Sequence, residues 1–472
     1  MPLSGSKEFI SDLLNLSFQS PPNAYDIFAG CEINGHALFS TGFRKPILIP
    51  KKDGLRIKVP TSFYPHQLLS LIDPETVVDV IDVRAQEEIQ MHLKDLISHF
   101  ERAPRVRLLN LLSLEFSQTK LSELVEPPHV VNELSLISNS WISDNEEESG
   151  CCNVPSVQKY CLLSMRGSYT DFHVDFGGSS VWYHVLWGEK IFYLIPPSSQ
   201  NLSLYWTWIQ SPNHRSTFFP NLLQECPCVS DSKVSNVIEL HVSTGQTILL
   251  PSGWIHAVYT VSDCLVFGGN FLTELHIPMQ LSIYKMEERC STPRKFQFPN
   301  FEKVHWFAAD RLVGKLTNIV HDKRTPAVHE IEAVYSLVRF LPEWLDRRCM
   351  DLPFVQLLEQ LRVLMRVFIP STNRKSKFPE ADVRTKKSNA KTTVSEPKPE
   401  VPSVSRESLQ IPCFPVGDLS KPKRRVRSSH KTISKPASAV TEDSEVIEAL
   451  PELNDSVLVG DHCKFVLVRY MY

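Results

Sequence analysis

His173 and Asp175 stand two residues apart in a run of aromatic and β-branched residues, 172–176, that is typical of a β-strand. Alternate side chains of a strand leave on the same face, so one imidazole and one carboxylate are expected to converge. His256 follows a second apolar strand and a turn at 251–253, and it offers a third ligand. Two imidazoles and one carboxylate on one face of a metal form the ligand set of non-haem Fe(II) oxygenases. A His-x-Asp pair by itself is also common in strands that bind no metal.

Lys190 is placed to meet an anion beside this strand. It follows a glycine-containing turn at 187–189 and begins the apolar strand 191–197. A buried ammonium without a partner is costly, so a lysine at the mouth of a β-barrel is expected to meet a negative charge, which a dicarboxylic cosubstrate would supply. The alternative interpretation is a solvated lysine at the end of a strand.

Short strands separated by turns must position these residues. Their spacing over 158–195 and 238–272 predicts two sheets folded into a barrel, with an irregular insertion at 198–233. Apolar positions three and four residues apart then predict helices that pack on the barrel as a bundle. These predicted helices cover 279–290, 328–348 and 354–368.

The residues ahead of the barrel are predicted to mix strands and helices. Asn110 is a polar residue inside an apolar strand, and a satisfied core amide is one interpretation of it. The predicted elements are a hairpin over 46–60, a strand at 77–83, a helix at 85–100, a strand at 107–117 and an exposed acidic loop at 137–150.

Composition sets the class of protein. The chain has 472 residues, 42% of them hydrophobic, which is enough for one large domain with additional segments. No stretch of about 18 apolar residues and no signal peptide is found, so neither a membrane protein nor a secreted one is predicted. The 11 cysteines are mostly scattered, and neither Cys151-Cys152 nor Cys226-Pro227-Cys228 is followed by a second pair at zinc-finger spacing. We therefore expect free thiols and no structural zinc site.

A basic segment rich in Ser and Pro follows at 371–440. It holds 16 Lys and Arg against 6 Asp and Glu, with almost no large apolar residues, and is therefore predicted to be a disordered tail. Because the whole chain has a formal net charge of −3, the remainder carries about −13. The densest cluster, 421–427, would suit nuclear import or non-specific contact with nucleic-acid phosphates, and a solubilising linker is the alternative.

Three long segments carry a family resemblance. SYTDFHVDFGGSSVWYHVLWGEKIFYLIPP (168–197), GQTILLPSGWIHAVYT (245–260) and DCLVFGGNFL (263–272) are similar to the catalytic core of the Jumonji-C histone lysine demethylases. More narrowly, the chain resembles the branch that usually carries a plant-homeodomain finger, and the similarity covers roughly residues 43–315. No such finger precedes residue 43, which leaves open how the protein would reach a methylated histone mark.

The resemblance implies a mainly β fold, a double-stranded β-helix (the jelly-roll or cupin-like Jumonji barrel) with flanking helices and a C-terminal helical bundle. It implies that Fe(II) binds His173, Asp175 and His256, and that 2-oxoglutarate and O2 are cosubstrates. Around the distal carboxylate of 2-oxoglutarate it places Lys190, Thr170 and Tyr183. It places Asn110 beside the cosubstrate, which is the second interpretation of that amide. Asn270 is expected near the methyl-ammonium of the substrate. The glycine pairs 177–178 and 268–269 are expected to let a peptide backbone approach.

The implied reaction removes methyl groups from mono- or dimethyl-lysine in histone tails on the nucleosome and releases formaldehyde and succinate in the nucleus. By resemblance the substrates are histone H3 positions nine or twenty-seven, or histone H4 position twenty. Two alternatives stay open: a protein side-chain hydroxylase of the same fold, and a non-catalytic chromatin adaptor. The expected organisation is an N-terminal segment 1–42, a mixed α/β part 43–125, the barrel 126–290, a helical region 291–370, the basic tail 371–440 and an acidic C-terminus 441–472.

Overall fold

A computed structural model describes residues 2–18, 21–141, 154–224, 237–348 and 352–368, which belong to one compact unit. The predicted basic tail 371–440 and the acidic segment 441–472 lie outside the described residues. So does most of the predicted loop 137–150, although its first residues form the end of helix α6, Leu136–Ser140. None of the described helices is long and apolar enough to cross a membrane.

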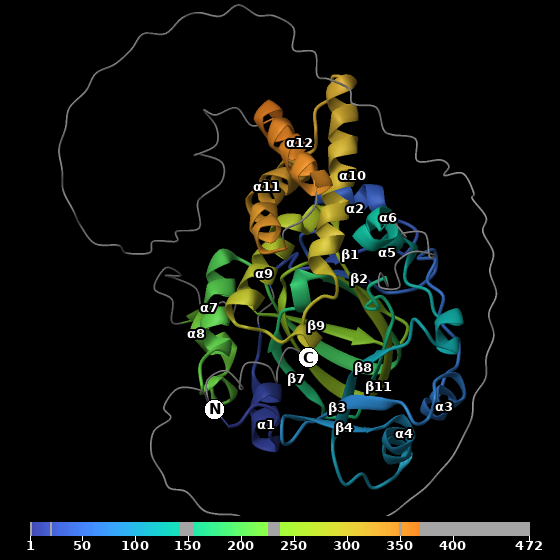
Figure 1. The fold of residues 1–472 in the computed structure, drawn as a ribbon. Helices are drawn as coiled ribbons and strands as arrows, with labels where there is room; N and C mark the ends of the chain where they lie inside the picture. Colours follow the sequence, from blue (N-terminus) through green and yellow to red (C-terminus); the bar gives the residue numbers. More distant parts are fainter. Residues whose placement is uncertain (1, 19–20, 142–153, 225–236, 349–351, 369–472) are drawn as a thin grey trace, which may run out of the picture. The chain divides into compact units, whose positions relative to one another are not determined.

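Two long strands form the centre of the barrel (Figure 1). β8 (Ser180–Ile195) and β11 (Ile255–Phe271) are antiparallel and paired from one end to the other. Register shifts in the middle of β11, between residues 260 and 266, mark the place where both strands bend. The two halves of each strand therefore have different neighbours: β9 and β10 pair with β8, while β6 and β7 pair with β11.

The remaining strands extend this sheet in the order β1-β2-β10-β8-β11-β6-β5-β3-β4. Their alternating apolar residues pack with helices α3 and α4 into the largest core cluster, around Leu111, Phe116 and Phe267. The bounds of the other strands are β1 Asp26–Ile27, β2 Ile47–Ile49, β3 Val77–Asp82, β4 Glu87–His92, β5 Leu109–Glu115, β6 Tyr160–Ser164, β7 Tyr169–His173, β9 Ile238–Ser243 and β10 Thr247–Leu250.

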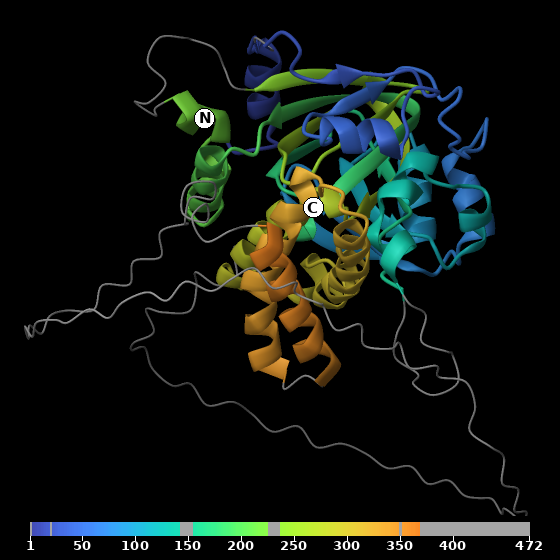
Figure 2. The same cartoon turned by 90° about the horizontal axis from the view of Figure 1, so that it is seen from above.

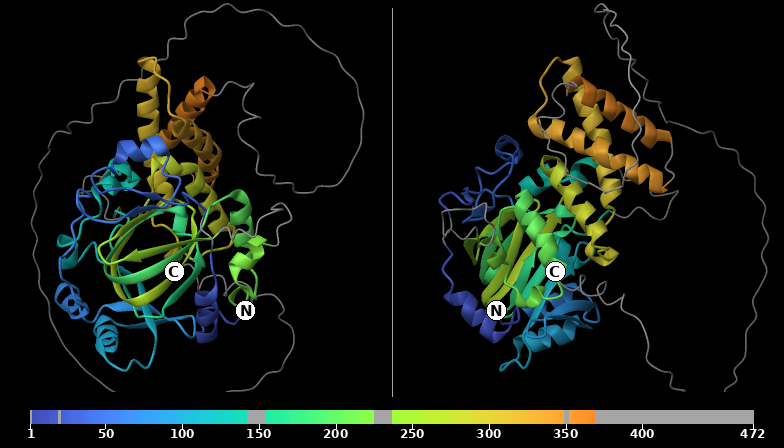
Figure 3. Two further views of the ribbon diagram at one scale, coloured as in Figure 1. Left: turned by 180° about the vertical axis from the view of Figure 1, so that it is seen from behind. Right: turned by 90° about the vertical axis from the view of Figure 1, so that its left-hand side faces the viewer.

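Helices cover the barrel on one side and at one end. α1 (Lys7–Asn15), α7 (Ser199–Ile209) and α8 (Phe219–Gln224) lie along one side (Figure 2). The helices α9 to α12 form the end bundle (Figure 3), and Leu281, Trp306 and Leu337 are part of its buried core. The bounds of the other α-helices are α2 Gly35–Thr41, α3 Leu68–Leu71, α4 Leu93–Glu101, α5 His129–Leu134, α9 Ile277–Arg289, α10 Phe301–His321, α11 Val328–Arg348 and α12 Leu352–Phe368. The short 3-10 helices are η1 Pro65–Gln67, η2 Lys120–Glu123, η3 Phe176–Gly178, η4 His214–Ser216, η5 Glu274–His276 and η6 Arg294–Phe296.

The predicted fold class is confirmed: a mainly β, jelly-roll barrel with flanking helices and a C-terminal helical bundle. The strands at 77–83 and 107–117 and the three helices after the barrel are confirmed as well. Four cysteines within the described residues are free thiols, as expected: Cys31, Cys161, Cys264 and Cys290.

Three local predictions are wrong, each because long-range pairing prevailed. The hairpin over 46–60 does not form, since β2 pairs in parallel with β1 and antiparallel with the distant β10. The first half of the predicted helix 85–100 is strand β4, whose Ile89 and Met91 pack on the core while it pairs with β3. The predicted irregular insertion 198–233 contains helices α7 and α8, whose aromatic residues are buried against Phe172 of the barrel.

Candidate metal and cosubstrate site

The two histidines face each other across paired strands. His173 is the last residue of β7, His256 is the second residue of β11, and the two are register partners. Their ring centroids are 4.1 Å apart. Asp175 lies beyond the end of β7 as the N-cap residue of η3, so a turn and not strand alternation brings it to the histidines. The predicted strand through Phe176 therefore ends three residues early.

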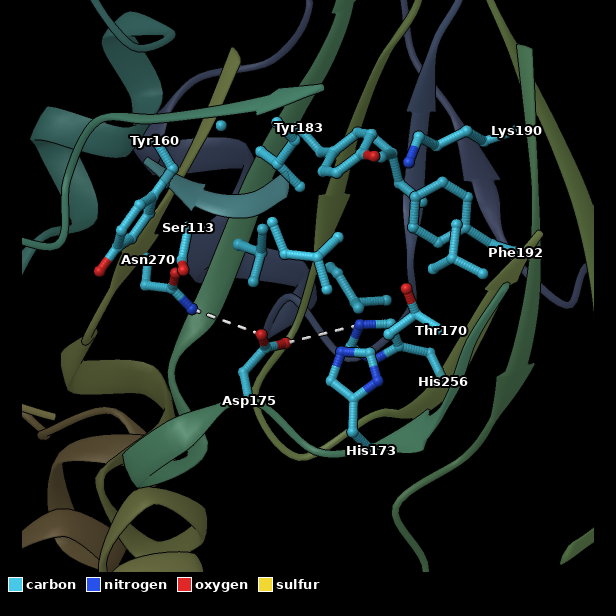
Figure 4. A pocket seen from close by; sticks show the side chains of 18 residues that line it. Ser113, Tyr160, Thr170, His173, Asp175, Tyr183, Lys190, Phe192, His256 and Asn270 are labelled. Atoms are coloured by element: carbon cyan, nitrogen blue, oxygen red, sulfur yellow. Dashed lines mark hydrogen bonds and ion pairs between the residues drawn. The ribbon is translucent and has the colours of Figure 1, made fainter. Parts of the chain in front are cut away.

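The donor atoms of these three residues lie within 4.8 Å of one another. One carboxylate oxygen of Asp175, Oδ2, is 3.9 Å from Nε2 of His256. All three side chains point to one spot at the bottom of a cavity (Figure 4). The structure thus brings together the three residues that the sequence singled out as metal ligands.

Both imidazoles are held in the form that binds a metal. Nδ1 of His173 is 2.9 Å from the carbonyl oxygen of Asp171, and Nδ1 of His256 is 3.0 Å from that of Trp254. A carbonyl only accepts, so each Nδ1 carries the proton and each Nε2 lone pair is left for a metal. Burial lowers the pKa of both histidines to about 4, and the neighbouring His256 adds to the effect on His173. Both rings are therefore neutral at physiological pH, as metal ligation requires.

Asp175 is oriented by an amide. Burial raises the pKa of Asp175 to about 6, against the opposing effects of His173 and Asn270. Nδ2 of Asn270 donates to Oδ1 of Asp175 at 3.4 Å and to Oγ of Ser179 at 2.9 Å, which leaves Oδ2 facing the histidines. Two neutral imidazoles and one oriented carboxylate fit the donor set of a non-haem Fe(II) centre. Asn270 itself lines the cavity at its contact with Asp175.

Lys190 lies in the same cavity, which has a volume of about 100 Å³. Only 2% of Lys190 is exposed, and its Nζ donates to Oγ of Ser164 at 2.8 Å. Within the described residues no carboxylate lies within 4.0 Å of this ammonium, and burial lowers its pKa. The interpretation as a solvated strand-end lysine is therefore wrong. The predicted turn at 187–189 is also wrong, because β8 continues through Gly188, whose φ is +99°.

Thr170 and Tyr183 belong to the cavity that contains Lys190, and Asn110 is connected to it through Thr170. Thr170 and Tyr183 line it, and Nζ of Lys190 is 5.9 Å from the Tyr183 ring centroid. Asn110 is 1% exposed and donates from Nδ2 to the Thr170 hydroxyl at 3.3 Å. Its Oδ1 has no hydrogen-bond partner among the described residues. Asn110 is thus not a fully satisfied core amide. The ammonium of Lys190 has a hydroxyl but no carboxylate as its partner in the described structure, which fits an anionic ligand.

Sequence reasoning missed several polar residues of the site. Ser164 and Ser179 hold Lys190 and Asn270, and Ser113 and Tyr160 line the cavity wall opposite the histidines. Single serines in strands carry no signal of their own. Only the strand register, in which Ser164 of β6 pairs with Asn110 of β5, could have indicated one of them.

The glycine pairs make room for the protein's own chain. A Cβ at Gly177 would lie 2.9 Å from Phe298, and one at Gly269 would lie 1.9 Å from the carbonyl oxygen of Gln158. Gly268 and Gly269 also line the cavity, and the approach of a peptide backbone to them stays a prediction. Gly177 also has a φ of +58°, a conformation that favours glycine.

A second group of possible metal ligands is already neutralised by a lysine. Glu274, His329 and Glu330 gather at the junction of barrel and helices, and Nζ of Lys315 lies 2.7 Å from a carboxylate oxygen of each glutamate. Burial alone would raise the pKa of Glu274, but His329 and Lys315 lower it to about 2. This cluster is an ion-pair network between η5, α10 and α11.

Comparison with known proteins agrees with this geometry. Residues 160–271 match the JmjC domain (hydroxylase), and residues 275–365 match the Jumonji helical domain. Lysine-specific demethylase 7A of Mus musculus is 40% identical over 346 residues, which cover 73% of this chain and 35% of that protein. Lysine-specific demethylase 7B of Danio rerio is 40% identical over 346 residues, covering 73% of this chain and 57% of the relative.

Histone lysine demethylase PHF8 of Danio rerio is 40% identical over 342 residues, covering 72% of this chain and 32% of the relative. The chain thus spans between about a third and somewhat over half of the length of these relatives. The paired strands that carry the two histidines, the order of the two matched domains and these similarities all lead to one conclusion. The chain belongs to the JmjC-domain family, within which it is similar to the lysine-specific demethylases.

Proposed function

We propose that this protein is an Fe(II)- and 2-oxoglutarate-dependent histone lysine demethylase. The observation that carries the proposal is the content of one cavity: a two-histidine, one-aspartate donor set together with a buried ammonium that no carboxylate among the described residues neutralises. A metal site alone would suit many reactions. The added demand for an anion, at the other end of the cavity, favours a dicarboxylic cosubstrate such as 2-oxoglutarate.

His173, Asp175 and His256 would hold Fe(II), which supplies the activation of O2. Lys190 would pair with the distal carboxylate of 2-oxoglutarate, and the Thr170 hydroxyl, the Asn110 amide and Tyr183 would complete its hydrogen bonding. Because the ammonium of Lys190 is desolvated before binding, it meets this carboxylate without first losing water.

Asn270 would lie next to the substrate methyl-ammonium while it orients Asp175. In the overall reaction, methyl-lysine, 2-oxoglutarate and O2 give lysine, formaldehyde, succinate and CO2, so each methyl group leaves as formaldehyde. Histone lysines as substrates would agree with the names of the similar proteins. Within histone tails we propose mono- and dimethyl-lysines, with histone H3 positions nine and twenty-seven first. The protein would act in the nucleus, where the basic segment 371–440 would add non-specific contact with nucleosomal DNA.

The test is mass spectrometry of the protein incubated with Fe(II), 2-oxoglutarate and a panel of methylated histone peptides, with His173→Ala as the matched control. We expect loss of methyl groups, with formaldehyde and succinate formed in equal amounts, in the wild type only. A peptide that gains oxygen and keeps it would identify a side-chain hydroxylase. No turnover of peptide or of 2-oxoglutarate, with the metal bound, would identify a non-catalytic adaptor.

A further inference from the structure

Glu287 is a buried acid whose carboxyl group reaches the metal-ligand turn from the helical bundle. It lies on α9, within the Jumonji helical domain, and is 0% exposed. Its Oε1 accepts the backbone N–H of Gly177 at 2.7 Å, and this hydrogen bond is itself buried. Its Oε2 has no hydrogen-bond partner among the described residues. No part of the proposed reaction uses this group.

Gly177 sits in the turn that places Asp175. That turn leaves β7 after His173 and passes through two consecutive glycines with positive φ, +58° and +59°. The N–H of Gly178 donates back to the carbonyl oxygen of Asp175 at 3.0 Å, and the Ser252 hydroxyl donates to the carbonyl oxygen of Gly178. Strand pairing fixes both histidines but ends before Asp175, so the carboxylate ligand is held by contacts of this turn and by the Asn270 amide.

We propose that Glu287 is a positioning residue for the metal site, which acts by holding the N–H of Gly177 and thereby the turn that carries Asp175. This inference rests on the proposed function only in taking His173, Asp175 and His256 as the metal ligands. A second consequence is that the helical domain is part of the metal site, because Glu287, which holds this turn, belongs to α9.

The carboxyl group is held in its neutral form. Burial raises the pKa of Glu287 to about 8, and the hydrogen bond from Gly177 only partly offsets this effect. A neutral group holds the turn without adding a negative charge next to the metal-ligand carboxylate. Glutamine has the same shape and also presents a carbonyl oxygen, so it should replace Glu287 in this role.

The test measures the affinity of the whole chain for Co(II). The titration is monitored through the visible absorption of bound Co(II), so the readout does not depend on turnover. Glu287→Met keeps the volume and removes the acceptor, and Glu287→Asp withdraws the acceptor by one methylene. Each is expected to weaken Co(II) binding about tenfold, as is usual when a group that orients a ligand is lost. Glu287→Gln is expected to bind within about twofold of wild type.

Glu330→Met is the matched control. Glu330 is also a buried glutamate that accepts one backbone N–H, that of Ala327 at 2.6 Å, but it lies in the ion-pair network of α11. Its loss should lower thermal stability and leave Co(II) affinity unchanged. If Glu287→Asp and Glu287→Met bind Co(II) as tightly as wild type, the inference is overturned; an equal loss in Glu330→Met also overturns it. Should Glu287→Met not fold, Glu287→Asp decides alone. Failure of the wild type to bind Co(II) would instead contradict the proposed metal site.

Discussion

Replacing Lys190 by Met tests the cosubstrate assignment most directly. The ammonium is 2% exposed and has Ser164 Oγ, but no carboxylate, as its neighbour in the described structure. In the variant, the distal carboxylate of 2-oxoglutarate would be buried without its counter-charge, at a cost of about 3–5 kcal/mol. We therefore expect its dissociation constant to rise by about 150- to 5000-fold.

The same variant should have the opposite effect on the ligand-free protein. Burial lowers the pKa of Lys190, which means that the fold disfavours the charged form. An apolar side chain of similar length removes this unfavourable charge, and replacing buried charges by apolar groups is often neutral or stabilising by about 1–4 kcal/mol. The melting temperature of the ligand-free variant should therefore be equal to or above that of wild type while affinity for 2-oxoglutarate collapses.

The assay is calorimetric titration of the Fe(II)-loaded protein without oxygen, with 2-oxoglutarate and with 2-oxopentanoate, which lacks the distal carboxylate. Wild type should prefer 2-oxoglutarate strongly, and Lys190→Met should bind the two ligands almost equally. Lys315→Met, which removes a lysine of the η5–α10–α11 network, is the control and should leave both affinities unchanged. A loss of affinity for 2-oxoglutarate of less than about tenfold, or an equal loss of affinity for both ligands, would refute the assignment of Lys190.

Three further predictions follow from the site and its surroundings. His173→Ala and His256→Ala should each abolish turnover and Co(II) binding. The circular dichroism spectrum should stay unchanged, because neither histidine belongs to the hydrophobic core clusters of the barrel. Activity in either variant would contradict the metal assignment. Burial raises the pKa of Glu287 in the folded protein from 4.5 to about 8, so wild type should lose stability relative to Glu287→Gln as pH rises through this range. The expected loss in free energy of unfolding, measured with urea, is up to about 1.4 kcal/mol per pH unit. A difference between the two proteins that does not change with pH would show that the carboxyl is ionised. Neutralising the basic cluster 421–427 should preserve turnover on short peptides and reduce nuclear accumulation and low-salt nucleosome activity, and equal values for both proteins would indicate a passive linker.

The parts of the fold that could be predicted are those with strong local periodicity. The C-terminal helices have long apolar stripes, and the barrel strands are bounded by Pro and Gly. The failures share one cause. Ile89 and Met91 are two residues apart, as in a strand, whereas Ile89 and Leu93 are four apart, as in a helix. Pairing of β4 with β3 decides between the two. The pairing of β2 with β10, about 200 residues later, has no local signal at all.

The residues of the site also divide into those with a local sequence signal and those without one. The ligand types and their spacing in sequence were sufficient to indicate a metal, and the resemblance implied where the cosubstrate would lie. The groups that orient the ligands could not be predicted, because each acts across the sheet or between domains. Asn270 reaches Asp175 from β11, and Glu287 reaches Gly177 from a helix in which a glutamate looks like an ordinary surface residue.

The buried polar groups of this cavity indicate how stability and function are connected. Asp175 has a raised pKa, Lys190 has a lowered one, and Oδ1 of Asn110 has no partner in the described structure, so each of them costs free energy in the ligand-free protein. In the proposed complex, the metal would relieve the first, and the cosubstrate carboxylate would relieve the second. Because Asp175 and Lys190 share one cavity of about 100 Å³, metal and cosubstrate should stabilise the fold together by more than the metal alone. The unfavourable charges of the ligand-free barrel are therefore arranged in advance for the two proposed ligands, and the proposed specificity for 2-oxoglutarate would follow from that arrangement.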